Sequence, residues 1–236
     1  MDAGADGRRV PARRRSRLTV VGIVLLLAGV GCLGWFGYQY LGTNIVSRQA
    51  FEQEASGLRA QWASEPAAPT APADPADPAD PVKASQAAVP SEAIALLRIP
   101  AFGADYEVPI LAGTDLAILD RGVGHYTQTA APGQIGNFAV AGHRVTHGQP
   151  FARLLELNPG DEIVVETREV IYTYVVDTAP RELTVSDGET WVLDPVPGEP
   201  AATPTRPLIT LTTCQDLFRS PDRSIAFGHL ASTTNK

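Results

Sequence analysis

Cys214, His143 and Arg223 are the residues whose types and spacing could do chemistry together. Cys214 directly follows the apolar run Leu208–Thr213, and it is the only cysteine outside an apolar N-terminal stretch. A thiolate is the attacking form of cysteine, and an imidazolium both stabilises the thiolate and protonates a leaving amine. An arginine stays charged and offers several N–H donors to an oxyanion or a peptide carbonyl. The three residue types therefore predict covalent acyl transfer by a cysteine nucleophile.

The segments around these residues are predicted to bring them to one edge of a sheet. Asn137–Arg144 has the pattern of a buried strand that ends near His143, and Pro207–Cys214 has the pattern of a second one. After a Pro-containing loop, Arg223 begins the next strand, so a hairpin would bring it close to Cys214. We expect the ends of these strands to border a surface groove.

Each of the three residues also has a less specific interpretation. Cys214 could be a small buried apolar side chain, His143 a surface histidine at a turn, and Arg223 a solvated charge. His125, which also follows a glycine, competes with His143 as the proton partner, and Arg219 competes with Arg223. We favour His143 and Arg223 because Arg219 lies in the middle of a loop, where its position would be poorly fixed, and because His125 is better suited to the border of the groove.

The region that carries these residues is predicted to be all-β with short peripheral helices. Short runs rich in Val, Ile, Leu, Thr and Tyr are separated by Gly, Pro and Asp. The predicted strands are Ala93–Ile99, Tyr106–Ile110, Asn137–Gly142, Glu162–Thr167, Val170–Asp177, Arg181–Val185, Leu208–Thr213 and Arg223–Leu230. The predicted helices are Thr114–Asp120, capped by Thr114, and Phe151–Leu157. A closed or nearly closed β-barrel is the simplest architecture for this number of strands.

One transmembrane helix is predicted at residues 18–41, ahead of this domain. Leu18–Leu41 contains no charged residue and would rise about 36 Å as a helix, enough to span a bilayer. Six arginines precede it in residues 1–17, which we expect to be a basic cytoplasmic tail. A cleavable signal peptide is the alternative, but the apolar run is long and has no small-residue cleavage site at its end. The prediction is a single-pass protein of the cell membrane with an extracellular catalytic domain.

Two segments are predicted between the membrane and the domain at residues 91–236. Residues 42–65 carry Phe51, Ala55, Leu58 and Trp62 at helical spacing, which indicates a juxtamembrane helical segment. Residues 66–90 are nearly all Ala, Pro and Asp, which is typical of a disordered, extended linker. The first 17 residues hold 6 of the 19 basic and 2 of the 26 acidic residues, so 13 basic and 24 acidic residues remain beyond them. The net charge of −11 argues against nucleic acid as a partner.

The motifs resemble those of the sortase family, the membrane-anchored cysteine transpeptidases of Gram-positive bacteria, and are most similar to class E. The resemblance rests on Thr210–Cys214, on Arg223 nine residues later and on the upstream Ala141–Arg144. It extends to Gly122–Tyr126, Pro132–Asn137, Pro150–Phe151, Gly160–Asp161 and Tyr172–Tyr174. It implies a closed eight-stranded sortase-like β-barrel with a catalytic triad of His143, Cys214 and Arg223.

The resemblance also implies a reaction. A sortase cleaves a sorting signal of the Leu-Pro-x-Thr-Gly or Leu-Ala-x-Thr-Gly kind between Thr and Gly, and it passes the thioacyl group to an amine of a cell-wall precursor such as lipid II. Cys214 would attack, His143 would transfer protons, and Arg223 would steady the substrate or the oxyanion. We expect His125, His147 and Thr213 to contact the peptide, with His147 where class E sequences often have Tyr. This chemistry requires no metal and no organic cofactor.

Other functions remain open. A pilin-polymerising sortase would share every one of these motifs. An L,D-transpeptidase is also a Cys–His acyl transferase, but its Ser-His-Gly-Cys context is absent from this sequence. A non-catalytic cell-wall binding module is favoured by the linker alone, and selective labelling of Cys214 by a thiol reagent would argue against it.

Overall fold

The computed structural model describes residues 17–64, 92–214 and 220–236. These residues belong to two compact units, one ending at Gln39 and one from Tyr40 to Lys236, and each is described by itself. The predicted cytoplasmic tail, except for Arg17, and the linker predicted at residues 66–90 lie outside the described residues. Arg219 lies outside them as well.

The first unit contains α1, Arg17–Gly37, which is followed by a π-helical turn, η1, Tyr38–Gly42. No residue of α1 is buried, and its large apolar side chains from Leu18 to Phe36 are exposed. As a helix of 21 residues, it rises about 31 Å, close to the roughly 30 Å of a bilayer core. The prediction of one helix long and apolar enough to cross a membrane is therefore confirmed.

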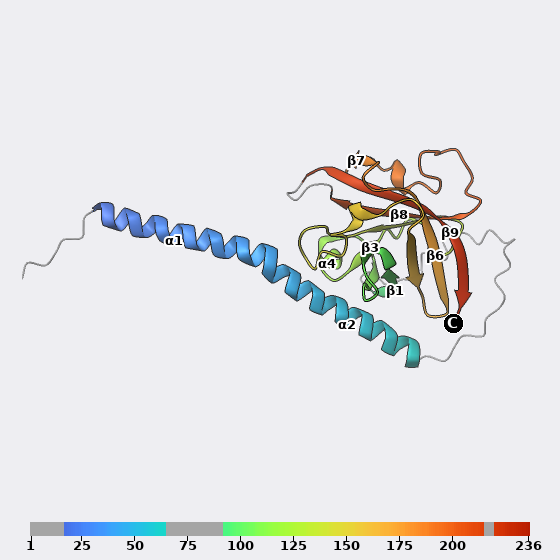
Figure 1. Ribbon diagram of the computed structural model, residues 1–236, viewed down its shortest axis with the longest axis horizontal. Helices are drawn as coiled ribbons and strands as arrows, with labels where there is room; N and C mark the ends of the chain where they lie inside the picture. Colours follow the sequence, from blue (N-terminus) through green and yellow to red (C-terminus); the bar gives the residue numbers. More distant parts are fainter. Residues whose placement is uncertain (1–16, 65–91, 215–219) are drawn as a thin grey trace, which may run out of the picture. The chain divides into compact units, whose positions relative to one another are not determined.

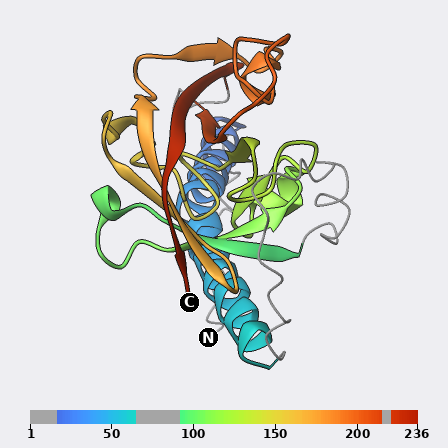
Figure 2. The ribbon, with the colours of Figure 1, turned by 90° about the vertical axis from the view of Figure 1, so that its right-hand side faces the viewer.

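Nine strands form one sheet in the second unit (Figure 1). They are β1 Ala93–Arg98, β2 Val108–Ala112, β3 Val123–His125, β4 Gly136–Ala141, β5 Glu162–Glu166, β6 Val170–Thr178, β7 Thr184–Ser186, β8 Pro207–Cys214 and β9 Asp222–Asn235. The order β6-β5-β1-β2-β3-β4-β8-β9 is closed by pairing of β9 with β6. The result is a barrel of eight strands that wrap around a common interior (Figure 2). This confirms the predicted closed barrel.

One of the predicted strands does not belong to the ring. The strand predicted at Arg181–Val185 corresponds to β7, which pairs with β9 at the end of the sheet order. The eighth strand of the barrel is instead β3, which was not predicted. β3 is only three residues long and contains Gly124, so it has neither the length nor the alternation of a recognisable strand.

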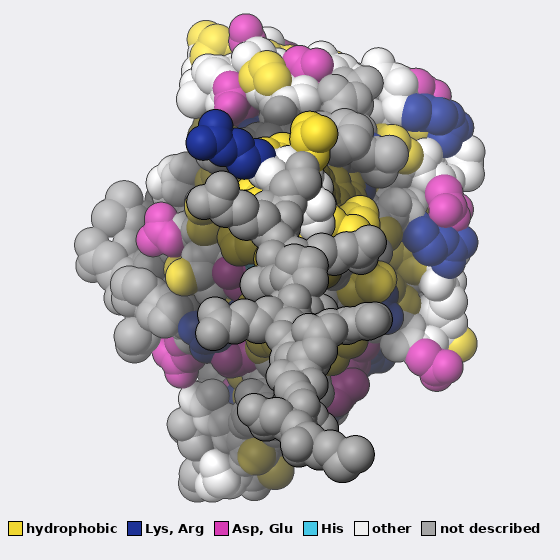
Figure 3. Space-filling view, turned by 90° about the vertical axis from the view of Figure 1, so that its left-hand side faces the viewer, with side chains coloured by type: hydrophobic (Ala, Val, Ile, Leu, Met, Phe, Trp, Pro, Cys, Tyr) yellow, Lys and Arg dark blue, Asp and Glu magenta, His cyan; other side chains and the backbone are white. Residues whose placement is uncertain are grey.

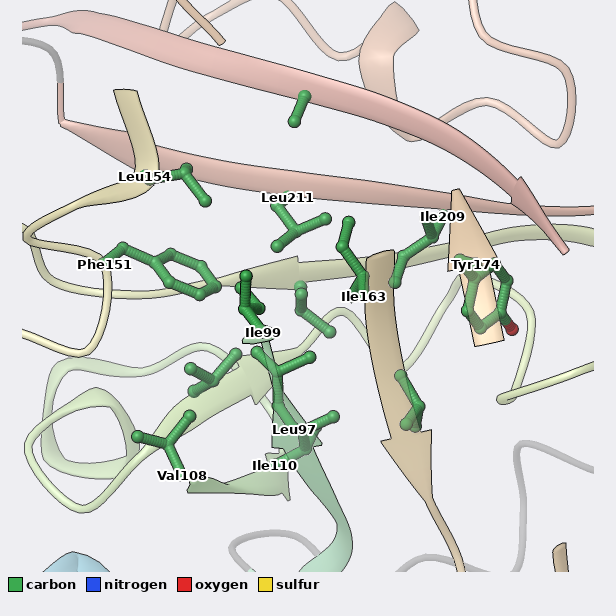
Figure 4. Packing of buried hydrophobic residues seen from close by; sticks show 14 of the residues in the cluster. Leu97, Ile99, Val108, Ile110, Phe151, Leu154, Ile163, Tyr174, Ile209 and Leu211 are labelled. Carbon is green, nitrogen blue, oxygen red and sulfur yellow. The ribbon is translucent and has the colours of Figure 1, made fainter. Parts of the chain in front are cut away.

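The interior of the barrel is filled by alternate residues of its strands. On β8, Ile209 and Leu211 are fully buried in the main core, where Figure 4 shows them near Ile163 and Ile99. Thr210 lies between them and donates to Asn137 Oδ1 at 2.7 Å. The Nδ2 group of Asn137 in turn donates to the carbonyls of Val192 and Asp194, at 3.0 and 3.1 Å. These bonds hold the short 3₁₀-helix η4, Trp191–Leu193, against β4 and β8.

The short helices differ in detail from the predicted ones. α4 spans Leu116–Leu119, and its N-cap is Asp115 instead of Thr114. The helix predicted at Phe151–Leu157 is only a 3₁₀ turn, η3, Leu154–Glu156. The turn ends because its C-cap, Leu157, is already extended at φ −60° and ψ 141°, and Phe151, Leu154 and Leu157 are all fully buried. A further 3₁₀ turn, η2, spans Pro100–Phe102.

The helix predicted at residues 42–65 is α2, which spans Thr43–Ser64 and is part of the second unit. Phe51 belongs to the main core of the barrel, whereas Ala55 and Leu58 pack in a smaller cluster with residues that include Leu96 and Leu111. Glu54 accepts hydrogen bonds from Arg121, which begins the turn before β3. The second compact unit therefore includes α2 and starts at Tyr40.

Candidate active site

The register of two parallel strands places Cys214 and His143 at one end of the barrel. β4 and β8 pair in parallel, and Ala141 is opposite Thr212. His143 lies two residues after Ala141, and Cys214 lies two residues after Thr212. Both residues therefore lie equally far beyond one register pair, Cys214 as the last residue of β8 and His143 in the segment that follows β4.

Hydrogen bonds continue the ladder up to these two residues. The backbone N–H of Gly142 donates to the carbonyl of Thr212 at 3.1 Å, and Thr213 Oγ1 donates to the carbonyl of Gly142 at 2.7 Å. Gly142 must lack a side chain, because a Cβ atom there would lie 2.7 Å from the ring of Phe151. The Phe151 N–H also donates to the carbonyl of His143 at 2.9 Å. The backbone on both sides of the Cys–His pair is thereby fixed.

Arg223 approaches Cys214 from the opposite side. It is the register partner of Cys214 across the antiparallel pair of β8 and β9. Its Nη1 donates to the carbonyls of Ser220 at 2.6 Å and Asp222 at 3.1 Å, while its Nη2 lies 3.5 Å from Asp187 Oδ2. Arginine has five N–H donors, so donors remain for an oxyanion or a peptide carbonyl. Cys214, on β8, therefore lies between β4, which leads to His143, and β9, which carries Arg223.

The imidazole of His143 shares a carboxylate with His147. Asp120, at the C-terminal end of α4, places Oδ1 3.5 Å from Nε2 of His143 and 3.5 Å from Nε2 of His147. The two imidazole rings are 4.8 Å apart with an interplanar angle of 32°. Burial and then the neighbouring His147 lower the pKa of His143, and Asp120 opposes both effects. His143 is thus mainly uncharged at neutral pH, as the acceptor of a thiol proton must be.

His147 lies in a turn that is held in place by contacts with α2. His147 and Gln149 have positive φ values of 52° and 55°, with Gly148 at 79° between them. The N–H of Gly148 donates to Asn44 Oδ1 of α2 at 2.8 Å, and a Cβ atom on Gly148 would lie 2.6 Å from the ring of Phe51. Non-glycine residues adopt this backbone region only where their surroundings enforce it. α2 supplies that support.

The other predicted site residues, Thr213 and His125, are more deeply buried than His143 and His147. Thr213 is only 2% exposed and bonds to Gly142, so it joins the two strands of the site. His125 is 4% exposed, stacks on Phe138, and has Nε2 3.0 Å from the carbonyl of Ala130. Burial lowers the pKa of His125 to about 4, which keeps it neutral. The structure therefore brings His147 to His143 but places His125 and Thr213 in the interior of the barrel.

Sequence reasoning missed two residues near the site. Asp120 has no pattern that would relate it to His143, since only the packing of α4 brings its carboxylate there. Tyr126 directly follows β3, and its N–H donates to the carbonyl of Ala139 at 3.0 Å. Burial raises the pKa of Tyr126, while the charge of Arg223 opposes that effect, which indicates that the phenol is near the guanidinium. No strand was predicted before Tyr126, so the sequence offered no signal for its position.

Within the described ranges, Asp120, His143 and His147 are the group of side chains that could hold a metal ion. On the face shown in Figure 3, acidic and basic side chains are interspersed among uncharged ones.

The fold and the site define a closed β-barrel with a cysteine, histidine and arginine at the ends of three adjacent strands. The chain belongs to the sortase family, because the model of the sortase domain matches residues 97–231. It is similar to sortase SrtE1 of Streptomyces coelicolor, with 35% identity over 239 residues that cover 94% of this chain and 62% of SrtE1. The chain therefore spans less than two thirds of the length of that relative.

Solved structures agree with this assignment. Sortase E of Streptomyces avermitilis is 39% identical with a TM-score of 0.56, over 62% of this chain and 93% of that chain. Sortase E1 of Streptomyces coelicolor, solved with a tripeptide in its active site, is 39% identical with a TM-score of 0.55, over 63% and 94% of the two chains. These relatives confirm the predicted relation to class E sortases.

Proposed function

We propose that the chain is a membrane-anchored cysteine transpeptidase that cleaves a Leu-Pro-x-Thr-Gly or Leu-Ala-x-Thr-Gly sorting signal between Thr and Gly. The observation that carries this proposal is that Cys214 ends β8, pairs in register with Arg223 of β9, and lies as many residues beyond the Ala141–Thr212 pair as His143, which follows β4. Membership of the sortase family, whose members are cysteine transpeptidases, supports it. So does the tripeptide in the active site of the relative from Streptomyces coelicolor.

In the first half-reaction, His143 accepts the proton of the Cys214 thiol. The thiolate attacks the carbonyl carbon of the motif Thr, and Arg223 donates hydrogen bonds to the oxyanion that forms. The C–N bond to Gly breaks as His143 gives its proton to the departing amine, which leaves a thioester on Cys214. The buried backbone around Gly142 and Thr213 serves this step by fixing the separation of the two reacting side chains.

The second half-reaction reverses these roles. An amine of a cell-wall precursor such as lipid II attacks the thioester, His143 takes the proton of that amine, and the thiolate of Cys214 departs. His143 lies in a site from which much of the water is excluded, and burial keeps its pKa below the ordinary value. This favours its role as a base before each attack. The imidazolium of His143 then returns its proton to the Cys214 thiolate, so the enzyme is regenerated. The two half-reactions therefore require no metal or cofactor.

The N-terminal helix gives the proposed cellular setting. α1 is long and apolar enough to span a membrane, and the arginines before it favour a cytoplasmic N-terminus. The barrel would then be extracellular, where secreted surface proteins and wall precursors meet.

A peptide assay tests the proposal. The full chain in detergent micelles is incubated with quenched Leu-Ala-x-Thr-Gly and Leu-Pro-x-Thr-Gly peptides and an amine acceptor, and products are identified by mass. We expect cleavage after Thr and a new amide with the acceptor. Cys214→Ala should abolish both products while the circular dichroism spectrum is unchanged. Full activity in that variant would refute the mechanism.

A further inference from the structure

Three side chains of types that bind metals, Asp120, His143 and His147, converge from two segments of the chain. Asp120 comes from the end of α4, His143 follows β4, and His147 lies in the turn after it. One ligand atom from each lies within 4.8 Å of the others, and both imidazole Nε2 atoms are 3.5 Å from Asp120 Oδ1. The proposed transpeptidase reaction makes no use of this convergence.

The spacing of these atoms fits a tetrahedral cation. Zinc binds imidazole nitrogen and carboxylate oxygen at about 2.0–2.2 Å, so two ligand atoms of a tetrahedral site are separated by about 3.3–3.6 Å. Both distances to the Asp120 oxygen are within that range. The ligand nitrogens of the two imidazoles are at most 4.8 Å apart. Because His147 is partly exposed in a turn, rotation of its ring can shorten this third ligand–ligand distance. Two imidazoles and one carboxylate leave a fourth position open to solvent, as in many zinc sites.

The Nε2 atom of His143 independently points to a ligand. It is buried and has no hydrogen-bond partner among the described residues. The 3.5 Å distance to Asp120 is longer than an ordinary N–H···O bond of about 2.7–3.2 Å. A buried polar atom without a partner costs free energy, and a cation between the three side chains would satisfy it.

We propose that Asp120, His143 and His147 form an inhibitory site for a divalent first-row transition metal, with Zn²⁺ as its best ligand. A cation on Nε2 of His143 prevents the ring from becoming an imidazolium, because that form needs a proton on both nitrogens. The ring then cannot hand a proton to the departing amine, and the acylation step stops. The inhibitory part of the proposal rests on the proposed function, whereas the binding site does not.

Metal binding is measured first, without reference to activity. The full chain in detergent, free of any affinity tag, is titrated with Zn²⁺ by calorimetry and with Co²⁺ by visible absorption. We expect one equivalent to bind, with affinity at least about tenfold lower in His147→Asn, since even outer-shell changes cost about 10- to 100-fold. His229→Asn is the matched control, because His229 also contacts a carboxylate, Asp177, at 2.8 Å, and it should bind like the wild type.

A thiol site is the competing explanation and is separated by Cys214→Ala. Retained binding in this variant supports the Asp120, His143 and His147 site. The site is refuted if binding is lost in Cys214→Ala, if His147→Asn binds Zn²⁺ as tightly as the wild type, or if no stoichiometric binding occurs.

Inhibition is measured next with the quenched peptide. Zn²⁺ should stop cleavage by the wild type, a chelator should restore it, and His147→Asn should need at least about tenfold more Zn²⁺ relative to its own uninhibited rate. Undiminished turnover with bound Zn²⁺ refutes the inhibitory role. Absence of cleavage under any condition refutes the transpeptidase function instead, and the titrations still decide the metal site.

Discussion

His143 and Cys214 each lie two residues beyond the register pair of Ala141 and Thr212, with Cys214 at the end of β8 and His143 in the segment that follows the parallel strand β4. Parallel neighbours point residues of equal level toward the same side of a sheet. The relation is fixed by backbone hydrogen bonds as far as Gly142 and Thr213. The backbone that leads to the proposed nucleophile and to its proton partner is therefore held by hydrogen bonds between the two segments.

His143→Ala and Arg223→Ala should each lower kcat/KM for the sorting peptide by at least about a hundredfold, the size expected for acid–base and oxyanion groups. His125→Ala and Arg219→Ala should lower it less. The measurement is the initial rate of peptide cleavage, with circular dichroism as a check on folding. A larger loss for His125→Ala than for His143→Ala would show that the proton partner is assigned wrongly.

Phe51→Ala should lower the free energy of unfolding by about 3 kcal/mol, as removal of a buried aromatic ring does. Phe51 is 6% exposed within the core cluster of the barrel and backs Gly148, so the variant should also cleave peptide more slowly through a loosened His147 turn. Urea unfolding of the full chain in detergent, followed by tryptophan fluorescence, measures the first effect. Ile45→Ala is the control on the same helix, since Ile45 is 61% exposed. Equal stability of the two variants would show that α2 does not stabilise the barrel.

His125 should make the protein less stable in mild acid. Its pKa is about 4 in the folded chain, against the ordinary value of 6.5, so the unfolded chain binds more protons between these values and stability falls as the pH drops. Between pH 7.5 and pH 5.0 the loss from this one group is about 2 kcal/mol. The change in the free energy of unfolding between pH 7.5 and pH 5.0 should be about 2 kcal/mol smaller in His125→Gln than in the wild type. The same change in both proteins would contradict the prediction.

His147 should influence which residue is accepted at the second position of the motif. A ring nitrogen of His147 can accept the backbone N–H of Ala, directly or through water, whereas Pro has no N–H to give. We expect a preference for Leu-Ala-x-Thr-Gly over Leu-Pro-x-Thr-Gly of roughly threefold to thirtyfold, the range of one imperfect hydrogen bond of about 0.5–2 kcal/mol. The ratio of kcat/KM for the two peptides is compared between the wild type and His147→Tyr. An unchanged ratio would exclude His147 from the selection of this residue.

Much of the fold follows from local pattern. A 24-residue run without charges, Leu18–Leu41, identifies a helix long and apolar enough to cross a membrane. Buried strands such as Pro207–Cys214 are recognisable because a continuous apolar run ends abruptly at a polar or reactive residue. β3 escaped prediction because its three residues are ordered by pairing with β2 and β4, which no local pattern records.

The sequence by itself determined the candidate nucleophile, its histidine and its arginine, because each is tied to the end of an apolar strand that any fold must bury. Only the tertiary structure decided which groups surround them. The packing of α4 brings Asp120 close to His143. His125 is buried because β3, which carries it, pairs with β2 on one side and β4 on the other. Both results depend on contacts between segments distant in the sequence, and such contacts are set by the closure of the barrel.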